Sequence, residues 1–187
     1  MSFEKFVINQ RDMKASEGSH IPVIIKIMEI SEGDVLELGT GLNSTPIFHW
    51  LAKAQGRKVD SYESNGMFHR HAYNYKSDSH TIHKVEDWDK DLKIDRHWGV
   101  VFIDHAPGKR RNVEMERVAN NADYVVVHDT EPRSDWHYNY SNHFDKYKYR
   151  YDYTKVYPHT SVFSNFKDVT NLFPEEKFET SISPQKK

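Results

Sequence analysis

The feature that most constrains this chain is a short apolar run followed by a glycine-rich turn, within residues 34–46 (DVLELGTGLNSTP). Gly39 and Gly41 let the backbone adopt positive φ and approach a ligand closely. Ser44 and Thr45 then offer hydroxyls that suit the start of a helix. We therefore predict a strand, a nucleotide-binding turn and a helix, although a Gly-x-Gly turn also occurs in loops with a purely structural role.

Two acids flank this turn in the predicted sheet. Glu37 lies at the carboxyl end of the first strand and is expected to face the crevice. Residues 58–65 (KVDSYESN) predict a second strand that closes on Glu63, where an acid can accept hydrogen bonds from both ribose hydroxyls of a nucleotide. The alternative role of Glu63 is to cap the helix that begins near Asn65.

Length and charge limit the classes of protein to consider. With 187 residues the chain fits one domain, 1–187, with a core over 14–170 and a peripheral tail over 174–187. A formal charge of −2, from 26 basic and 28 acidic residues, gives no overall attraction to nucleic acid or anionic lipid. Neither is therefore expected as a partner.

The cysteine count and the apolar runs exclude further classes. Without cysteine there is no disulfide, thiolate metal site or cysteine nucleophile, which leaves the 12 histidines as candidates for chemistry. The N-terminus has an early acid and no signal-peptide core, and no apolar run approaches the ~20 residues of a membrane span. We expect a cytoplasmic protein with no membrane partner.

The pattern of apolar residues predicts an α/β fold. Helical spacing is present in four stretches, residues 21–30, 45–55, 66–75 and 112–121. Strands are predicted over residues 34–38, 58–62, 80–84, 99–104, 124–129, 149–157 and 160–164. This order describes a doubly wound, mostly parallel, seven-stranded sheet whose C-terminal strand is reversed by a hairpin.

Further acids follow the two most apolar strands. Asp104 and Asp129 end adjacent predicted strands, and ligands of open α/β sheets bind outside such carboxyl ends. The two carboxylates can share one Mg²⁺ or Mn²⁺, because hard cations take oxygen ligands. Thr130 or Glu131 is the candidate third ligand. The alternative is that both aspartates only cap loops.

Basic groups beside these acids are candidates for proton transfer. His105 and His128 each adjoin an aspartate, a combination suited to acid–base chemistry near neutral pH. His128 is expected to point into the packing of the sheet, so His105, in a loop, is the better base. Lys109 is a second candidate base, within a basic cluster that can also hold an anion or simply start a solvated helix.

Four segments resemble class I S-adenosylmethionine-dependent methyltransferases, over roughly residues 14 to 170. ELGTG at 37–41 is similar to their first motif, and YESN at 62–65 to their acidic ribose-binding motif. VFIDH at 101–105 and VVHDT at 126–130 resemble the metal-carrying segments of the catechol and caffeoyl-CoA O-methyltransferase branch. The segment ASEGS at 15–19 is similar to the one before that branch's entry helix, at the methionine end of the cofactor.

The resemblance implies a Rossmann-like methyltransferase fold, S-adenosyl-L-methionine as cofactor and a divalent metal. Cofactor contacts are expected, from the resemblance and from position in the predicted sheet, at Ser16, Glu37, Gly39, Thr40, Gly41, Ser44, Thr45, Glu63, Ser64, Asp87, Trp88 and Asp104. Metal ligands are expected at Asp104, Asp129 and Thr130, and catalytic roles at Asp104, His105 and Lys109.

Two positions depart from that branch. Thr130 stands where the branch usually has asparagine, which weakens the third metal ligand. Pro107 stands where its catalytic lysine is expected, three positions after the first metal aspartate. Lys109 or His105 must then replace that lysine, or proton removal proceeds in another way.

A second resemblance concerns the acceptor. GLNST at 41–45, DHAPG at 104–108 and the pair His128-Asp129 are similar to methyltransferases that act on uronic acid hydroxyls of plant polysaccharides, and to small sugar methyltransferases of large DNA viruses. This resemblance implies a sugar or glycan acceptor. Trp136, Tyr138 and Tyr140 can stack on sugar faces or serve in packing.

The expected activity is therefore O-methylation of a sugar hydroxyl, and two alternatives stay open. An NAD(P)-dependent oxidoreductase also suits the glycines and Glu63, although Ser44 occupies the third glycine position. A non-catalytic module that keeps the cofactor pocket is the other alternative, because the expected lysine is missing. The sequence leaves the oligomeric state open, a homodimer included.

Overall fold

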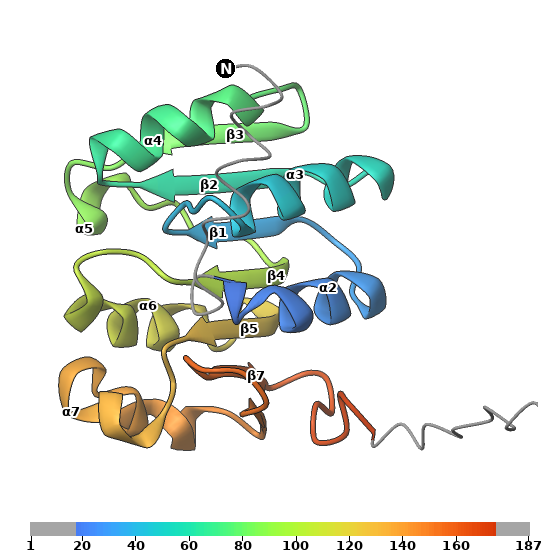
Figure 1. The fold of residues 1–187 in the computed structure, drawn as a ribbon, viewed down its shortest axis with the longest axis vertical. Coiled ribbons are helices and arrows are strands. Elements are labelled where there is room, and N and C mark those ends of the chain that lie inside the picture. Colours follow the sequence, from blue (N-terminus) through green and yellow to red (C-terminus); the bar gives the residue numbers. More distant parts are fainter. Residues whose placement is uncertain (1–17, 175–187) are drawn as a thin grey trace, which may run out of the picture.

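The computed structural model describes residues 18–174 and contains one seven-stranded sheet (Figure 1). Its strands are β1 (Val35–Leu38), β2 (Val59–Glu63), β3 (His80–Lys84), β4 (Trp98–Ile103), β5 (Ala122–His128), β6 (Tyr149–Tyr153) and β7 (Thr160–Ser164). The strand order is β3-β2-β1-β4-β5-β7-β6. β1 to β5 are parallel, whereas β7 runs antiparallel to both β5 and β6. The predicted doubly wound sheet with a reversed last strand is confirmed.

Helices connect the parallel strands. They are α2 (Ile21–Ile30), α3 (Ser44–Ala54), α4 (Gly66–Ala72), α5 (Trp88–Asp91), α6 (Arg111–Val118) and α7 (Asp135–Tyr138). Short 3₁₀ turns, η2 to η5, cover Tyr73–Tyr75, Gly108–Arg110, Pro132–Ser134 and Tyr140–Lys146. Within the described residues, no helix is both long enough and apolar enough to cross a membrane.

The main differences from the prediction concern three element boundaries and the segment after Asp129. The predicted helix over 66–75 continues after α4 only as a 3₁₀ turn, and the one over 112–121 ends at Val118. The predicted strand over 149–157 ends at Tyr153. The polar, aromatic segment after Asp129 folds into α7 and 3₁₀ turns. These elements are too short to show the periodic spacing of apolar residues that predicts a helix.

Every residue of β1 and β4 is buried, so these strands are covered on both faces of the sheet. One face packs on α2 and α3, with a core that includes Val35, Phe48, Val100 and Phe102. The opposite face packs on α6 and its neighbours, with a core that includes Leu38, Trp98, Ile103 and Met115. Because β1, β2, β4 and β5 run parallel, their carboxyl ends lie at one edge of the sheet, on the left of Figure 1.

One glycine of β4 permits an unusually close approach between neighbouring backbones. A Cβ at Gly99 would overlap the carbonyl oxygen of Glu32, in the turn that leads into β1. At Gly66, the first residue of α4, no atom lies within 4 Å of the added Cβ. The two glycines therefore form a matched pair for testing this packing.

We expect Gly99→Ala to lower the free energy of unfolding by about 1–3 kcal/mol, because backbone atoms must move to admit the methyl group. Gly66→Ala should be neutral or slightly stabilising, because alanine favours a helix by up to ~1 kcal/mol over glycine. Urea unfolding of both variants measures the difference. Equal stability of the two variants would contradict the close approach at Gly99.

Candidate functional site

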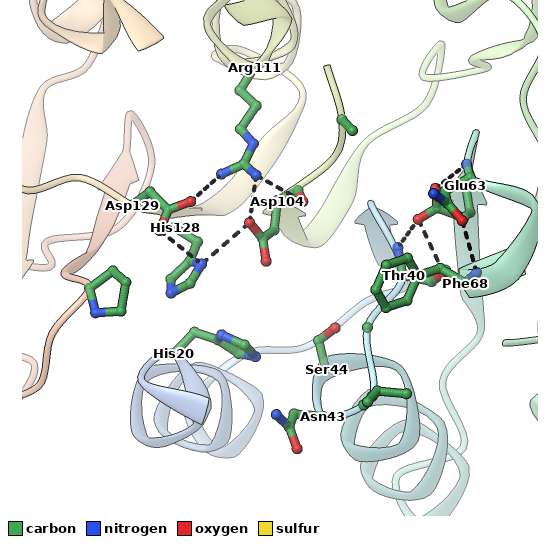
Figure 2. Close-up of a pocket in the computed structure, with 15 residues that line it drawn as sticks. His20, Thr40, Asn43, Ser44, Glu63, Phe68, Asp104, Arg111, His128 and Asp129 are labelled. Carbon is green, nitrogen blue, oxygen red and sulfur yellow. Dashed lines mark hydrogen bonds and ion pairs between the residues drawn. The ribbon is translucent and has the colours of Figure 1, made fainter. Parts of the chain in front are cut away.

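A cavity of about 540 Å³ lies at the carboxyl edge of the sheet (Figure 2). Its size falls within the range of small-molecule sites. Glu63 and Thr40 lie at one end, and Asp104, His128 and Asp129 lie at the other. The cavity therefore offers two chemically different ends.

At the first end, Glu63 joins the loops that follow β1 and β2. The backbone N–H and the hydroxyl of Thr40 donate to Glu63 Oε2, at 2.8 and 3.2 Å, and the N–H of Asn65 donates to Oε1. A carboxylate accepts about four hydrogen bonds, so these three leave it capacity for a ligand. Glu63 is the last residue of β2, while the cap of α4 is Asn65, whose side chain accepts from Met67 and Phe68.

The glycine turn lines the cavity only in part. Thr40, Gly41 and Ser44 lie in its wall. Gly39, with φ of 92°, lies instead against the loop after β4, where an added Cβ would be 2.5 Å from the His105 backbone. Gly39 is therefore required because the turn packs closely against the protein's own backbone. We had expected this glycine to permit the close approach of a ligand.

Glu37 does not face the crevice as predicted, because it is fully buried beneath the turn. The hydroxyl of Ser61 donates to it at 2.6 Å, and that of Thr45 at 3.0 Å. Thr45 in turn accepts from the N–H of Gly41 at 3.0 Å. Both predicted cofactor contacts, Glu37 and Thr45, therefore support the turn from below.

Burial raises the pKa of Glu37 to about 7. The hydrogen bonds from Ser61, Ser44 and Thr45 favour the charged form and offset only part of this rise. The folded protein thus binds a proton here that the unfolded chain releases near its ordinary pKa of 4.5. Because the native state holds more protons between these values, this group's contribution to stability falls as pH rises.

The predicted cation position between Asp104 and Asp129 is filled by a guanidinium. Arg111 lies 2.9 Å from Asp104 Oδ1 and 2.9 Å from Asp129 Oδ2, and its Nε donates to the His105 carbonyl at 2.8 Å (Figure 2). Burial opposes its charge, but the two carboxylates hold the pKa of Arg111 well above its usual value. The two aspartates are near neighbours, as predicted, but the cation they share is a side chain.

The other predicted oxygen ligands are engaged elsewhere. The Thr130 hydroxyl accepts from Ser161 at 2.7 Å, and Glu131 accepts from the Ser134 hydroxyl at 2.6 Å. Neither residue lines the cavity. The predicted metal triad of Asp104, Asp129 and Thr130 is therefore not assembled.

His128 lines the cavity, which corrects the expectation that it points into the sheet. Its Nδ1 lies 3.3 Å from Asp104, an ion-pair distance, and its Nε2 lies 2.9 Å from the hydroxyl of Ser19. Burial disfavours the imidazolium, yet the Asp104 carboxylate holds the pKa of His128 above its usual value. His20, beside it, has a pKa lowered to about 4 by burial and by the nearby His128.

Neither predicted base lines the cavity. His105 is buried on the far side of its loop, where its ring stacks on Trp88 at 4.2 Å and lies 3.6 Å from Glu114. Lys109 is exposed on η3. The neighbouring Arg110 pairs with Asp89 and Glu114, so the basic cluster is mostly neutralised internally.

Besides Glu37, Gly39 and Thr45, three more predicted cofactor residues lie outside the cavity wall. The Trp88 indole donates to the carbonyl of Ala106 at 3.1 Å, and so does the Ser64 hydroxyl, also at 3.1 Å. Asp87 caps α5 by accepting from the N–H of Asp89. Ser16, another predicted contact, lies outside the described residues.

The aromatic residues after Asp129 serve mainly in packing. Tyr140 is buried and donates to the His128 carbonyl at 3.1 Å, and Tyr138 donates to Asp129 at 3.0 Å. Trp136 is 80% exposed and does not line the cavity. A sugar-stacking role is therefore not available to Tyr140.

Sequence reasoning missed several residues of the wall. These are His20, Leu42, Asn43, Asn65, Phe68, Ala106, Arg111 and Pro158. Some signal was present, because Leu42, Asn43, Asn65 and Ala106 lie within the motifs at 41–45, 62–65 and 104–108. No local pattern indicated His20, which reaches the cavity only because α2 begins at the carboxyl edge of the sheet.

Comparison with protein-family models and with curated proteins gave no match. Solved structures are similar at low identity. An O-methyltransferase from Bacillus cereus in complex with SAH (S-adenosylhomocysteine) has a TM-score of 0.58 and 14% identity, over 86% of this chain and 89% of that one. Cofactor-bound Rv0187 from MTB has a TM-score of 0.59 and 15% identity, over 84% of each chain.

A third similar structure is a complex with RNA. The hMettl16 catalytic domain in complex with a MAT2A 3′UTR hairpin has a TM-score of 0.57 and 12% identity, over 81% of this chain and 70% of that one. The chain thus has the Rossmann-like methyltransferase fold, with the reversed last strand of its sheet. Its acceptor must be argued from the site.

We expect the stability difference between wild type and Glu37→Gln to change with pH. Between pH 5 and pH 8 the free energy of unfolding of wild type should fall by about 1–3 kcal/mol relative to that of the variant. Over this range Glu37 must lose its proton in a buried site, whereas glutamine has no proton to lose. Urea unfolding at both pH values gives the two differences. A difference that stays constant, or that moves in favour of wild type as pH rises, would contradict the raised pKa.

Proposed function

We propose that this protein is an S-adenosylmethionine-dependent methyltransferase. The observation that supports this most directly is the position of Glu63, which lines the cavity at the end of β2, beside the turn after β1, with acceptor capacity left for ribose hydroxyls. The similarity to SAH-bound and cofactor-bound methyltransferase structures supports the same cofactor.

The sheet argues against the oxidoreductase alternative. The common dinucleotide-binding fold continues its parallel order past the fifth strand, whereas here β7 is inserted antiparallel beside β5. Ser44 also lies where the third glycine of a dinucleotide fingerprint belongs. NAD(P) is therefore the less favoured cofactor.

For the reaction we propose O-methylation of a sugar or glycan hydroxyl. The second end of the cavity combines Asp104, His128 and Asp129, and the two carboxylates have oxygens that can accept hydrogen bonds from hydroxyls. The cofactor supplies an electrophilic methyl group. A C–O bond to the acceptor replaces the C–S bond, and the hydroxyl proton leaves toward the Asp104–His128 pair.

The Asp104–His128 pair also argues against the alternative that the protein is a non-catalytic module. That alternative rests on the missing lysine at Pro107. The Asp104–His128 pair supplies a carboxylate and an imidazole at the cavity, so proton removal does not require that lysine. His105 and Lys109, the bases predicted from the sequence, are not needed in this role.

We expect Glu63→Ala to weaken SAH binding by at least about tenfold, because it removes the acceptor of the ribose hydroxyls. Asp87→Ala is the matched control: it removes a carboxylate that the sequence also predicted to bind the cofactor but that lies outside the cavity. Calorimetric titration with SAH measures both. Equal losses in the two variants, or heat from NAD or NADP but none from SAH, would overturn the assignment.

We expect His128→Gln to reduce methyl transfer by about 100-fold or more while SAH still binds, because the imidazole acts on the acceptor and not on the cofactor. Lys109→Ala should retain activity, since Lys109 does not line the cavity. The assay is mass spectrometry of sugars, uronic acids and oligosaccharides after incubation with the cofactor. Loss of activity in Lys109→Ala alone would restore the basic cluster as the source of the base.

A further inference from the structure

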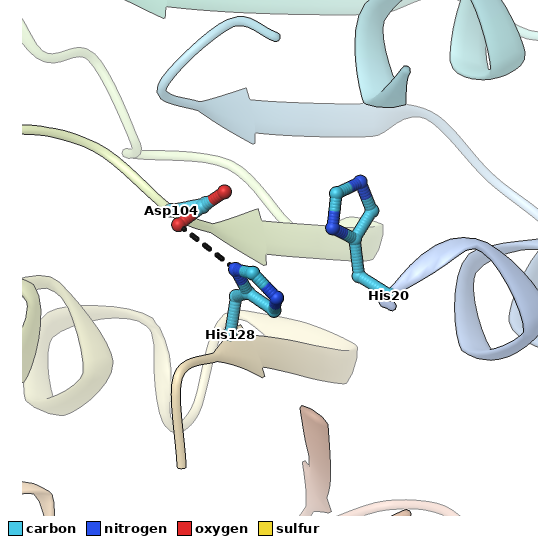
Figure 3. Close-up of side chains that lie close together, drawn as sticks. All are labelled: His20, Asp104 and His128. Carbon is cyan, nitrogen blue, oxygen red and sulfur yellow. Dashed lines mark ion pairs between the residues drawn. The ribbon is translucent and has the colours of Figure 1, made fainter. Parts of the chain in front are cut away.

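Three side chains at the second end of the cavity meet from three different segments (Figure 3). His20 precedes α2, Asp104 follows β4 and His128 ends β5. One potential ligand atom from each lies within 4.8 Å of the other two. All three residues line the cavity, so this set is open to solutes.

The environment of His20 is a second, independent observation that points to a ligand at this cluster. The residue is only 4% exposed, and within the described residues neither ring nitrogen has a hydrogen-bond partner. Its ring lies edge-on to His128, with 4.8 Å between the ring centroids, and tilted on Phe102. A buried imidazole without partners is costly, so an additional group that it can bind is expected at this place.

We propose that His20, Asp104 and His128 bind one divalent transition-metal ion, of the Mn²⁺ or Zn²⁺ class. The set differs from the metal triad predicted from the sequence, with which it shares only Asp104. Two imidazole nitrogens and one carboxylate favour such ions over Mg²⁺, which prefers oxygen ligands. Three protein ligands leave coordination positions for water or for an acceptor hydroxyl.

The surrounding contacts are compatible with this ligand set. Arg111 and His128 both approach Oδ1 of Asp104, and no contact between described residues uses Oδ2. Metal–ligand bonds of ~2.1 Å bring ligand atoms within ~4.2 Å of one another, so only small side-chain rotations are required.

This inference deepens the proposed function and rests on it for its role: the ion would hold and acidify the acceptor hydroxyl. With the ion bound, Asp104 and His128 would act on the acceptor as ligands, and the hydroxyl proton would pass to the Asp129 carboxylate in the cavity wall or to water. Binding of the ion itself does not depend on turnover. It is therefore tested without acceptor or cofactor, on the full chain after removal of metals with EDTA.

Calorimetric titrations with MnCl₂, ZnCl₂ and MgCl₂ are the experiment. We expect about one Zn²⁺ or Mn²⁺ per chain, and Mg²⁺ binding at least about tenfold weaker, because of the imidazole ligands. His20→Asn should weaken binding at least about tenfold, and Asp104→Asn likewise. His97→Ala, which removes an exposed histidine paired with Asp123, should bind as wild type does. Far-UV circular dichroism confirms that each variant is folded.

Each outcome decides the inference. No binding of Zn²⁺ or Mn²⁺ to wild type overturns it, as does full affinity in folded His20→Asn, or a loss caused by Asp129→Asn but not by His20→Asn. Full methyl transfer in EDTA overturns the ion's role in the reaction and leaves the proposed function standing. Metal binding without SAH binding supports the site and overturns the proposed function.

Discussion

The interaction on which the site depends is the clamp that Arg111 forms with Asp104 and Asp129. One buried guanidinium joins the carboxyl ends of β4 and β5 and also holds the loop backbone at His105. Two carboxylates this close repel one another, and a buried cation relieves that repulsion without an external ion. The clamp fixes Asp104, and Asp104 in turn lies against His128.

A second network, made of hydrogen bonds, supports the other end of the cavity. Glu37, Ser61 and Thr45 form a buried chain of hydrogen bonds below the turn after β1, and Thr45 accepts from Gly41 in that turn. Glu63 then joins the turn to the end of β2. The two acids of the sequence motifs thus have different positions: Glu37 supports the turn from inside the core, and Glu63 lines the cavity.

Much of the fold was predictable because periodicity reports burial directly. The continuous apolar runs of β4 and β5 indicated strands covered on both faces, and the spacing in α2 indicated a helix with one buried side. The segment after Asp129 was not predictable as helical, because its elements are only three to seven residues long and are held by tertiary contacts such as the Tyr140 hydrogen bond.

By itself the sequence determined the order of elements, the edge of the sheet where the cavity lies, and the presence of Glu63, Asp104 and Asp129 at that edge. Only the tertiary structure decided that Arg111 takes the cation's place, that His105 turns away from the cavity, and that His20 enters it. The reason is physical: local patterns specify which face of an element is buried, but not which distant side chains meet. Ser19 and His128, 109 residues apart in sequence, lie within hydrogen-bond distance only because α2 packs at the carboxyl edge of the folded sheet.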